Sequence, residues 1–420
     1  MDFGGRIMKS AILSVGTELL FGQITNTNTV YLSRQLNMLG HDVMYHYTVG
    51  DNAGRLADMI RLALEDCDIV LTTGGLGPTQ DDMTKEVVCQ VMGDELVMMD
   101  DVMDELLGYF KRVKRTMTEN NKKQAVLPSR AVVFHNDAGT APGFALEKDG
   151  KYVICMPGPP REMTRMFEKS VMPFLQSLSE GVIYYRMVRT FGLGESQMET
   201  DLLDLIDNQT DPTLATYAKE GEASVRIASK RGTKEEAKAA VDEMLVKVRE
   251  RIGRYIYSCD DQELVQVVCG KLMEKGLTLS SAESCTGGMF AAAVTDIPGI
   301  SECFERSLVT YSNRAKMEEL GVKAETLEKY GAVSRETAME MAEGLAKVSG
   351  SDVCVSVTGV AGPGGGTDEK PVGLVYIGLW YDGKVSCRKL GMRNHGRKWN
   401  RHYSVLNMLD MINECVFGRN

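Results

Sequence analysis

Residues 68–84 read DIVLTTGGLGPTQDDMT, an apolar strand that ends in paired glycines and turns into a helix near Asp82. The chain before this stretch repeats the same alternation. The segments expected there are a strand at 11–15, a helix at 29–39, a strand around 43, a helix at 54–66 and the strand 68–73. Strands that alternate with helices are typical of a doubly wound α/β domain with a parallel sheet. We expect this first domain to cover residues 1–175.

Two further parts follow this domain. Residues 176–257 combine the short strands YYRMVRTFG and SVRIASK with a long helical stretch at 234–252, which indicates a small α+β module. Residues 258–420 again alternate strands with helices and predict a second α/β domain. A chain of 420 residues is long enough for two or three such domains.

Composition narrows the class of function. The net charge is −10, so a direct nucleic-acid interface, which needs a basic face, is not expected. Ten cysteines without a CxxC pair and five scattered histidines show no zinc-ligand spacing. No apolar run approaches the roughly 20 residues of a membrane span, and the start MDFGGRIMKS lacks the apolar stretch of a signal peptide. We therefore expect a cytoplasmic protein without a membrane partner.

Three polar segments follow expected strands of the first domain, where ligands bind in open α/β sheets. They are SVGTELLFGQITNTN, TVGDN with Asp51, and TTGGLGPTQDDMT with Gly74, Gly75, Thr79, Asp81 and Asp82. Glycine lets backbone N–H groups approach a phosphate, and the helix that follows favours an anion. The neighbouring carboxylates indicate a bridging divalent cation, since they would otherwise repel an anionic substrate. The alternative is that the glycines form a tight turn and the acids cap a helix.

These segments, together with GTAPGF and PGPPREM, resemble the N-terminal pattern of the CinA family, which is related to molybdopterin-binding enzymes of the MogA and MoaB type. The resemblance covers about residues 1–175. It implies that Asp51 and Asp82 serve a nucleotide site and that the domain is an ADP-ribose pyrophosphatase dependent on a divalent metal. The segments TFGLGES and LATYAKEGEASVRIAS resemble the KH-like module of the same family.

The last domain carries AESCTGG directly after the apolar strand LTLSS and before a helical pattern. Ser284 therefore lies at a strand-to-helix turn, with Gly287 and Gly288 relieving crowding at the start of the helix. A hydroxyl in this position lies near free N–H groups, which suits an anion site or an oxyanion hole. Ser284 or Thr286 as a simple helix cap is the alternative.

Two more segments of this domain are candidates for the same site. LVTYSNRAK ends a strand at Tyr311 and starts a helix with Lys316, which can point into one cleft with the tyrosine or remain a solvated lysine. VSVTGVAGPGGGT reaches Thr358 and continues into a loop that contains Gly364 and Gly365. Such a loop wraps a phosphate or a ribose, or it is only a flexible turn.

The chemistry that fits these residues is a serine–lysine dyad. Lysine accepts a serine proton once burial or neighbouring cations lower its pKa. Only His395 and His402 lie in this domain, in a distant stretch, so a Ser–His triad has little support. Cys285 is the competing nucleophile, but no histidine stands near it in the sequence to support a thiolate.

The motifs AESCTGG, YSNRAK and VTGVAGPGGGT resemble the CinA C-terminal domain, the nicotinamide-nucleotide amidohydrolase of the PncC type, over about residues 260–415. The resemblance implies Ser284 as nucleophile, Lys316 as its base, and Tyr311 and Thr358 as supporting residues. The late arginine of the family falls best on Arg397, although HGRKWNR lacks the aspartate that precedes it in the family.

The resemblance thus implies hydrolysis of nicotinamide mononucleotide to nicotinic acid mononucleotide and ammonia, without a cofactor, in the pyridine nucleotide cycle. Two alternatives stay open. In one, only the N-terminal pyrophosphatase is active. In the other, the chain is a competence-linked interaction protein for which nucleotides are regulatory ligands. In either case we expect a homodimer.

Overall fold

The computed structural model describes residues 8–178, 181–219, 221–392 and 395–418. The chain divides into two compact units, residues 1–183 with 230–237 and residues 184–229 with 238–420. Residues 1–7 of the first expected domain and residues 419–420 of the last lie outside the described part. Within the described part, no helix is long and apolar enough to cross a membrane.

The first unit is built on a six-stranded sheet with the order β2-β1-β3-β8-β7-β6. The strands are β1 (Lys9–Val15), β2 (Asp42–Val49), β3 (Ile69–Thr73), β6 (Val132–Phe134), β7 (Gly143–Lys148) and β8 (Lys151–Met156). A separate pair is formed by β4 (Leu96–Met98) and β5 (Val126–Pro128). Because β2 and β3 pair in parallel with opposite edges of β1, the strand order reverses at β1. Ligands bind at such switch points in open α/β sheets.

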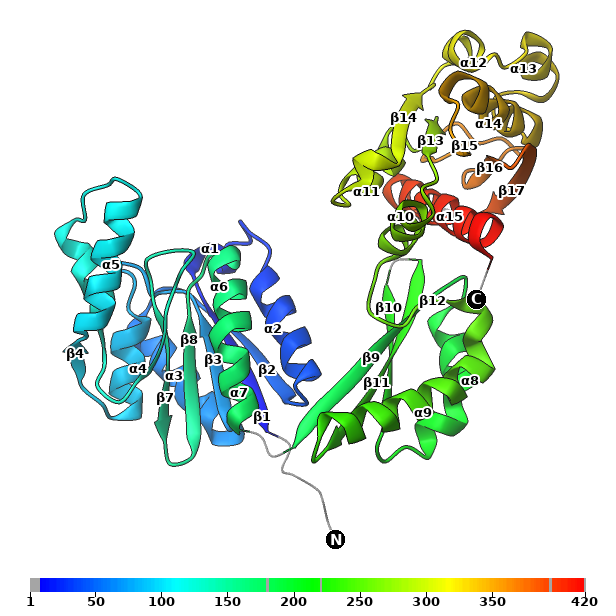
Figure 1. Ribbon diagram of the computed structural model, residues 1–420. Coiled ribbons are helices and arrows are strands. Elements are labelled where there is room, and N and C mark those ends of the chain that lie inside the picture. The colour runs from blue at the N-terminus through cyan, green and yellow to red at the C-terminus, as the bar shows by residue number, and fades with distance from the viewer. Residues whose placement is uncertain (1–7, 179–180, 220, 393–394, 419–420) are drawn as a thin grey trace. The chain divides into compact units, whose positions relative to one another are not determined.

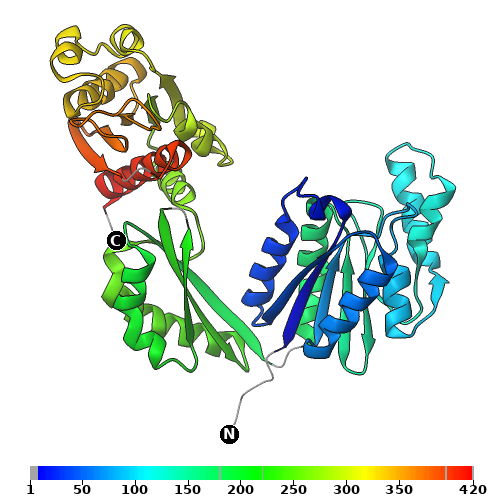
Figure 2. The same ribbon diagram turned by 180° about the vertical axis from the view of Figure 1, so that it is seen from behind.

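Two layers of helices cover this sheet (Figures 1 and 2). The helices are α1 (Thr17–Leu20), α2 (Thr27–Met38), α3 (Ala53–Asp66), α4 (Thr84–Met92), α5 (Asp100–Arg112), α6 (Pro160–Met166) and α7 (Met172–Leu178). Ile12 of β1 packs in one core cluster with residues of α2, α6 and α7. Leu13 packs in a second cluster with residues of α3, α4 and α5. Successive strand residues thus face opposite layers, which confirms the doubly wound fold expected from the sequence.

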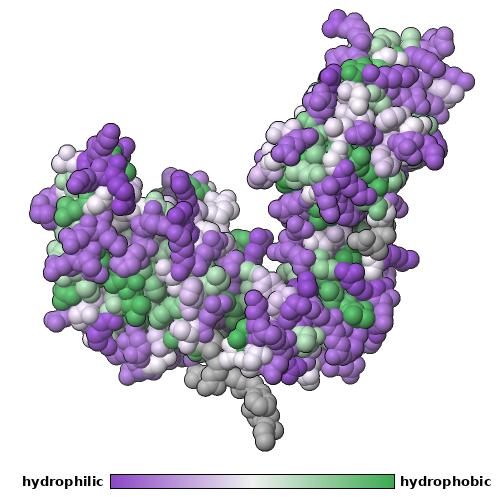
Figure 3. Space-filling model, in the orientation of Figure 1, coloured by the Kyte–Doolittle hydropathy of each residue, from purple (hydrophilic) through white to green (hydrophobic). Residues whose placement is uncertain are grey.

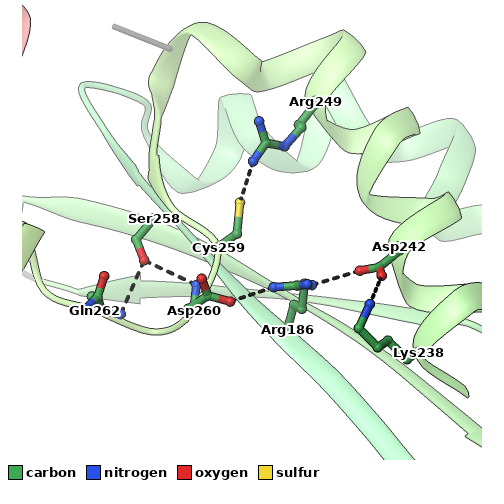
Figure 4. A network of polar contacts seen from close by, with 8 residues as sticks. All are labelled: Arg186, Lys238, Asp242, Arg249, Ser258, Cys259, Asp260 and Gln262. Carbon is green, nitrogen blue, oxygen red and sulfur yellow. Dashed lines mark hydrogen bonds and ion pairs between the residues drawn. The ribbon is translucent and has the colours of Figure 1, made fainter. Parts of the chain in front are cut away.

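The middle module is a four-stranded sheet, ordered β10-β11-β9-β12, with two helices. Its elements are β9 (Val182–Phe191), α8 (Glu195–Asp207), β10 (Thr213–Lys219), β11 (Glu222–Arg231), α9 (Lys234–Ile252) and β12 (Ile256–Ser258). Arg186 of β9 pairs with Asp242 of α9 at 2.9 Å and with Asp260 at 2.5 Å (Figure 4). These ion pairs tie the helix and the segment after β12 to the sheet.

The C-terminal domain has a five-stranded sheet with the order β14-β13-β15-β16-β17. Its strands are β13 (Leu279–Glu283), β14 (Phe304–Val309), β15 (Val353–Gly359), β16 (Leu374–Tyr381) and β17 (Lys384–Gly391). Its helices are α10 (Leu264–Lys275), α11 (Met289–Thr295), α12 (Asn313–Leu320), α13 (Ala324–Tyr330), α14 (Arg335–Ser349) and α15 (Arg397–Phe417). Here β14 and β15 pair in parallel with opposite edges of β13, so a second switch point follows β13.

The outer surface is largely hydrophilic on the face shown in Figure 3. This agrees with a chain in which 25% of the residues are charged. Val309, the last residue of β14, is 47% exposed, and Tyr311, two residues later, is 61% exposed. They lie beside the switch point of the C-terminal domain.

Two helix glycines of the C-terminal domain give a test of its packing. A Cβ on Gly344 of α14 would lie 1.8 Å from the backbone oxygen of Leu320, whereas a Cβ on Gly270 of α10 would meet no atom within 4 Å. Alanine normally stabilises a helix interior by about 0.5–1 kcal/mol relative to glycine. We expect G270A to raise the unfolding midpoint of this domain in urea. G344A should lower it by the equivalent of about 1–3 kcal/mol, the usual cost of overpacking. Equal midpoints for the two variants would contradict the close packing of α14 on the end of α12.

Candidate active site

Ser284 directly follows β13, which lies between β14 and β15 in the C-terminal sheet. Every residue of β13 is buried, and Ser284 follows it with 9% of its surface exposed. The Ser284 amide continues the sheet by donating to the Val357 carbonyl at 3.1 Å. The chain then turns through Gly287 and Gly288, whose φ angles of 57° and 89° are left-handed. Glycine suits both positions because other residues rarely adopt such angles, so the strand can pass directly into α11.

Lys316 reaches Ser284 from the first turns of α12. Ser312 caps this helix by accepting a hydrogen bond from the Ala315 amide at 3.1 Å. The lysine side chain is 1% exposed, and its Nζ lies 3.1 Å from Ser284 Oγ. Nζ also donates to the carbonyls of Thr310 at 2.7 Å and Tyr311 at 3.4 Å. The structure thus brings together the two residues to which the sequence assigned the dyad.

The surroundings of Lys316 shift the equilibrium between its charged and neutral forms. Burial lowers the pKa of Lys316 below its ordinary value, and the nearby Cys285 thiol opposes this shift. An ammonium group has three N–H donors, whereas the neutral amine keeps two and gains a lone pair. The two carbonyls accept two N–H bonds, and the third direction meets the Ser284 hydroxyl. This arrangement suits an amine that accepts the serine proton.

Cys285 is a poor candidate nucleophile in this structure. It is 6% exposed, and burial raises the pKa of its thiol to about 12. A thiol attacks as the thiolate, which is scarce at neutral pH when the pKa is this high. The geometry therefore favours Ser284 over the neighbouring cysteine.

Only part of the nucleophile turn is free to bind an oxyanion. The amides of Ser284, Gly287 and Gly288 donate to Val357, Ser284 and Glu283, respectively. Among the described residues, the amide of Thr286 has no hydrogen-bond partner, and the amide of Cys285 contacts only the thiol of its own side chain. These two N–H groups are the candidates for an oxyanion hole.

Arg397 connects two other predicted parts of the site. Its Nη1 donates to the Gly362 carbonyl at 2.8 Å, and its Nη2 donates to the Tyr311 hydroxyl at 3.3 Å. The arginine thus joins the glycine-rich loop to the tyrosine beside the lysine helix. It stands at the start of α15 and is exposed. An exposed guanidinium here is available to an anionic group.

The remaining predicted residues of this domain are less engaged. Thr358 is 1% exposed and donates its hydroxyl proton to the Ala332 carbonyl at 2.7 Å. Gly364 and Gly365 lie in an open part of the loop, where an added Cβ would meet no atom within 4 Å. The structure shows no contact between these two glycines and the dyad.

In the first unit, the predicted residues gather at the switch point of the larger sheet. Asp51, after β2, accepts hydrogen bonds from the amide and hydroxyl of Thr17, after β1, at 3.1 and 2.7 Å. Asp82 Oδ2 accepts hydrogen bonds from the amide of Thr79 at 2.9 Å and from its hydroxyl. A hydrogen bond from Thr79 also lowers the pKa of Asp81. The first two polar segments thus meet through Thr17 and Asp51, and the third follows β3, which pairs with β1 in the same sheet.

The paired glycines keep the loop after β3 close to the sheet. A Cβ on Gly74 would lie 2.2 Å from the Val15 oxygen, and one on Gly75 would lie 2.1 Å from Thr84 Oγ1. Both positions also have a positive φ, so glycine is needed there for two reasons.

Asp81 and Asp82 supply only some of the ligands that a divalent cation needs. Among the described residues, no group of three or more His, Cys, Asp or Glu side chains could hold a metal ion. Asp82 binds Thr79 through Oδ2 alone, which leaves Oδ1 for a cation. Mg²⁺ is often held by one or two carboxylates, with waters and substrate phosphates completing its shell. The residues therefore fit a metal that arrives with a phosphorylated substrate.

Some residues of both sites were not singled out from the sequence. Lys123 binds the candidate loop of the first unit by donating to the carbonyls of Thr79 and Asp82. Glu283 is fully buried directly before the nucleophile. A signal for Glu283 was present, because an acid that ends an apolar strand just before a helix is placed to bind helix N–H groups. Lys123 gave no comparable signal, since it lies 41 residues from Asp82.

Comparison with known proteins identifies the family. A CinA-like protein from Dictyoglomus turgidum is 48% identical over 405 residues, which cover 96% of this chain and 98% of that protein. A CinA-like protein from Kosmotoga olearia is 45% identical over 97% of this chain and 99% of its own length. The chain belongs to the CinA family.

The domain matches agree with this assignment. Residues 261–416 match the CinA C-terminal domain, residues 11–177 the probable molybdopterin binding domain, and residues 185–258 the KH domain of damage-inducible protein CinA. A crystal structure of a competence/damage inducible protein from Agrobacterium tumefaciens is 42% identical. It covers 36% of this chain and 94% of its own, with a TM-score of 0.35. The resemblance to this family and its three-domain architecture, expected from the motifs, are confirmed.

Proposed function

We propose that the C-terminal domain hydrolyses the carboxamide of nicotinamide mononucleotide to nicotinic acid mononucleotide and ammonia. The observation that carries this proposal is the buried contact of 3.1 Å between Lys316 Nζ and Ser284 Oγ. A serine beside a desolvated lysine is suited to acyl transfer. The family resemblance of the surrounding motifs supplies the substrate.

The reaction proceeds in two acyl-transfer steps. Neutral Lys316 takes the Ser284 proton as Oγ attacks the amide carbon, and the amides of Cys285 and Thr286 stabilise the oxyanion. When the C–N bond breaks, the proton passes to the leaving nitrogen, which departs as ammonia. Water then attacks the nicotinoyl ester, Lys316 takes its proton and returns it to Ser284 Oγ, and the acid is released. The protons balance without a cofactor.

In this proposal Arg397 selects the substrate, and Tyr311 orients Arg397 and assists the leaving amine. The guanidinium of Arg397 pairs with the phosphate of the substrate. Its hydrogen bonds to the Gly362 carbonyl and the Tyr311 hydroxyl fix its orientation before the substrate binds. The Tyr311 hydroxyl accepts from Arg397 and keeps its own proton, so it is better placed than Thr358 to assist the leaving amine. Thr358 instead holds the turn at Ala332.

We also propose that the first unit is a metal-dependent ADP-ribose pyrophosphatase. The placement of Asp51, Asp82 and the loop of Gly74 and Gly75 at one switch point supports a nucleotide site there. Asp81 and Asp82 would hold the divalent cation, which would neutralise charge on the pyrophosphate. The chain's own amides in the loop would bind the phosphate oxygens.

Lysine variants test the amidase directly. K316R keeps the charge but does not release its proton at accessible pH, so we expect its kcat to fall by about 10²–10⁴-fold, as for loss of a general base. Because the pKa of Lys316 is lowered, the neutral fraction and the rate should rise with pH along one ionisation below that of free lysine, about 10.4. K316A should lose this increase of the rate with pH. K347R, at an exposed lysine of α14, is the control and should behave as wild type. A K316R enzyme with substantial kcat would disprove the dyad.

An aspartate variant tests the pyrophosphatase separately. We expect D82N, or excess EDTA, to reduce ADP-ribose cleavage more than about 100-fold, since even loss of an outer-shell partner of a metal ligand typically costs 10–100-fold. Deamidation should be unchanged, and D149N, at an exposed turn between β7 and β8, serves as the control. ADP-ribose cleavage that survives both treatments would remove the proposed metal site.

A further inference from the structure

Glu283 directly precedes the nucleophile and is completely buried. Its carboxylate accepts hydrogen bonds from the backbone amides of Gly288 at 3.0 Å, Phe290 at 3.1 Å and Ala291 at 2.9 Å. The Ser307 hydroxyl adds a longer contact of 3.4 Å. These donors compensate the burial of a carboxylate, which would otherwise be costly.

The contacts of Glu283 close a ring around the nucleophile turn. The side chain starts from the residue before Ser284 and ends on amides that come four to seven residues after Ser284. The turn therefore has both of its ends bound to one carboxylate. Ser284 Oγ and the amides of Cys285 and Thr286 lie within this closed segment.

A second contact holds the turn from α15. Arg401 Nη2 donates to the Thr286 carbonyl, and a Cβ on Gly287 would lie 3.5 Å from the same nitrogen. Fixing the Thr286 carbonyl also fixes the peptide plane that it shares with the Gly287 amide. The turn is thus bound by a carboxylate on its amide side and by a guanidinium on its carbonyl side.

We propose that Glu283 is a positioning residue, which holds Ser284 and the amides of Cys285 and Thr286 in the geometry needed for attack and oxyanion binding. It does not touch the substrate. This inference rests on the proposed amidase function for its kinetic consequences. The physical basis is that oxyanion donors act only when they are held in place before the reaction.

The test compares E283Q with wild type in the full-length protein. Glutamine keeps the shape, but it loses the charge and turns an NH₂ group toward one of the backbone N–H donors. We expect kcat for nicotinamide mononucleotide to fall about 10- to 100-fold, the equivalent of one charge-assisted hydrogen bond. KM should be nearly unchanged, because an interaction that acts only in the transition state is lost. E302Q, at an exposed glutamate of the same domain, is the matched control.

A second measurement distinguishes the positioning role of Glu283 from a purely structural role. It also does not depend on the proposed amidase activity. The rate at which a fluorophosphonate labels Ser284, measured by mass, reports the nucleophile without the substrate. Slower labelling in E283Q supports the positioning role even if wild type does not deamidate the nucleotide, in which case only the proposed function fails. Labelling at the wild-type rate overturns the positioning role. A lower labelled fraction that reacts at the wild-type rate indicates loss of folded protein and also overturns it.

A milder variant covers the case in which E283Q does not fold. S307A removes the longest contact of the carboxylate, and it also removes the hydrogen bond of 2.7 Å that Ser281 Oγ donates to Ser307 Oγ. S281A, which removes the second of these hydrogen bonds alone, is its control. We expect a decrease in kcat and in the labelling rate of about two- to tenfold, the value of one ordinary hydrogen bond. Unchanged rates in S307A, with E283Q unfolded, would contradict the proposal.

Discussion

The burial of one lysine amine beside one serine hydroxyl is the constraint on which the C-terminal site depends. Lys316 is 1% exposed and has no carboxylate partner among its hydrogen-bond contacts, only two carbonyls and Ser284 Oγ. Desolvation disfavours the ammonium form, and this effect is larger than the opposing effect of the nearby Cys285 thiol. The same burial that costs stability therefore favours the neutral amine that the proposed function requires. The rest of the domain, from the cap at Ser312 to the turn at Gly288, keeps that amine in position.

Both candidate sites lie at a switch point between parallel strands, where polar loop residues come together. In each sheet one strand, β1 or β13, pairs in parallel with a strand on either side. The loops that leave these strands diverge to opposite sides and open a space above the sheet. The first unit fills that edge with glycines and aspartates, which suits phosphate and metal. The last domain fills it with serine and lysine, which suits acyl transfer.

The fold followed from periodicity and turn residues because these are local properties. Strand 68–73 and helix 29–39 were placed within a few residues of β3 and α2. The proximity of Ser284 and Lys316, 32 residues apart, came from the family resemblance, since spacing alone cannot predict a contact over that distance.

The hydrogen-bond partners of the other site residues could not be predicted from the sequence. The hydroxyl of Thr358 turns to Ala332 and Arg397 reaches Gly362, because α13, α14 and α15 pack in a particular way on the sheet. Glu283 was visible in AESCTGG, but its function depends on where α11 starts. Such details are decided by tertiary packing and not by local sequence.

The ionisation of Lys316 itself is the most direct test. With ¹³C-labelled lysine, the Cε resonance of Lys316 is assigned by its absence in K316R and followed by NMR from neutral to alkaline pH. The account predicts a midpoint below the ordinary lysine value of about 10.4, because the buried amine loses its proton more readily. A midpoint at or above that value would mean that Lys316 is an ammonium ion at neutral pH, and it would contradict its assignment as the base.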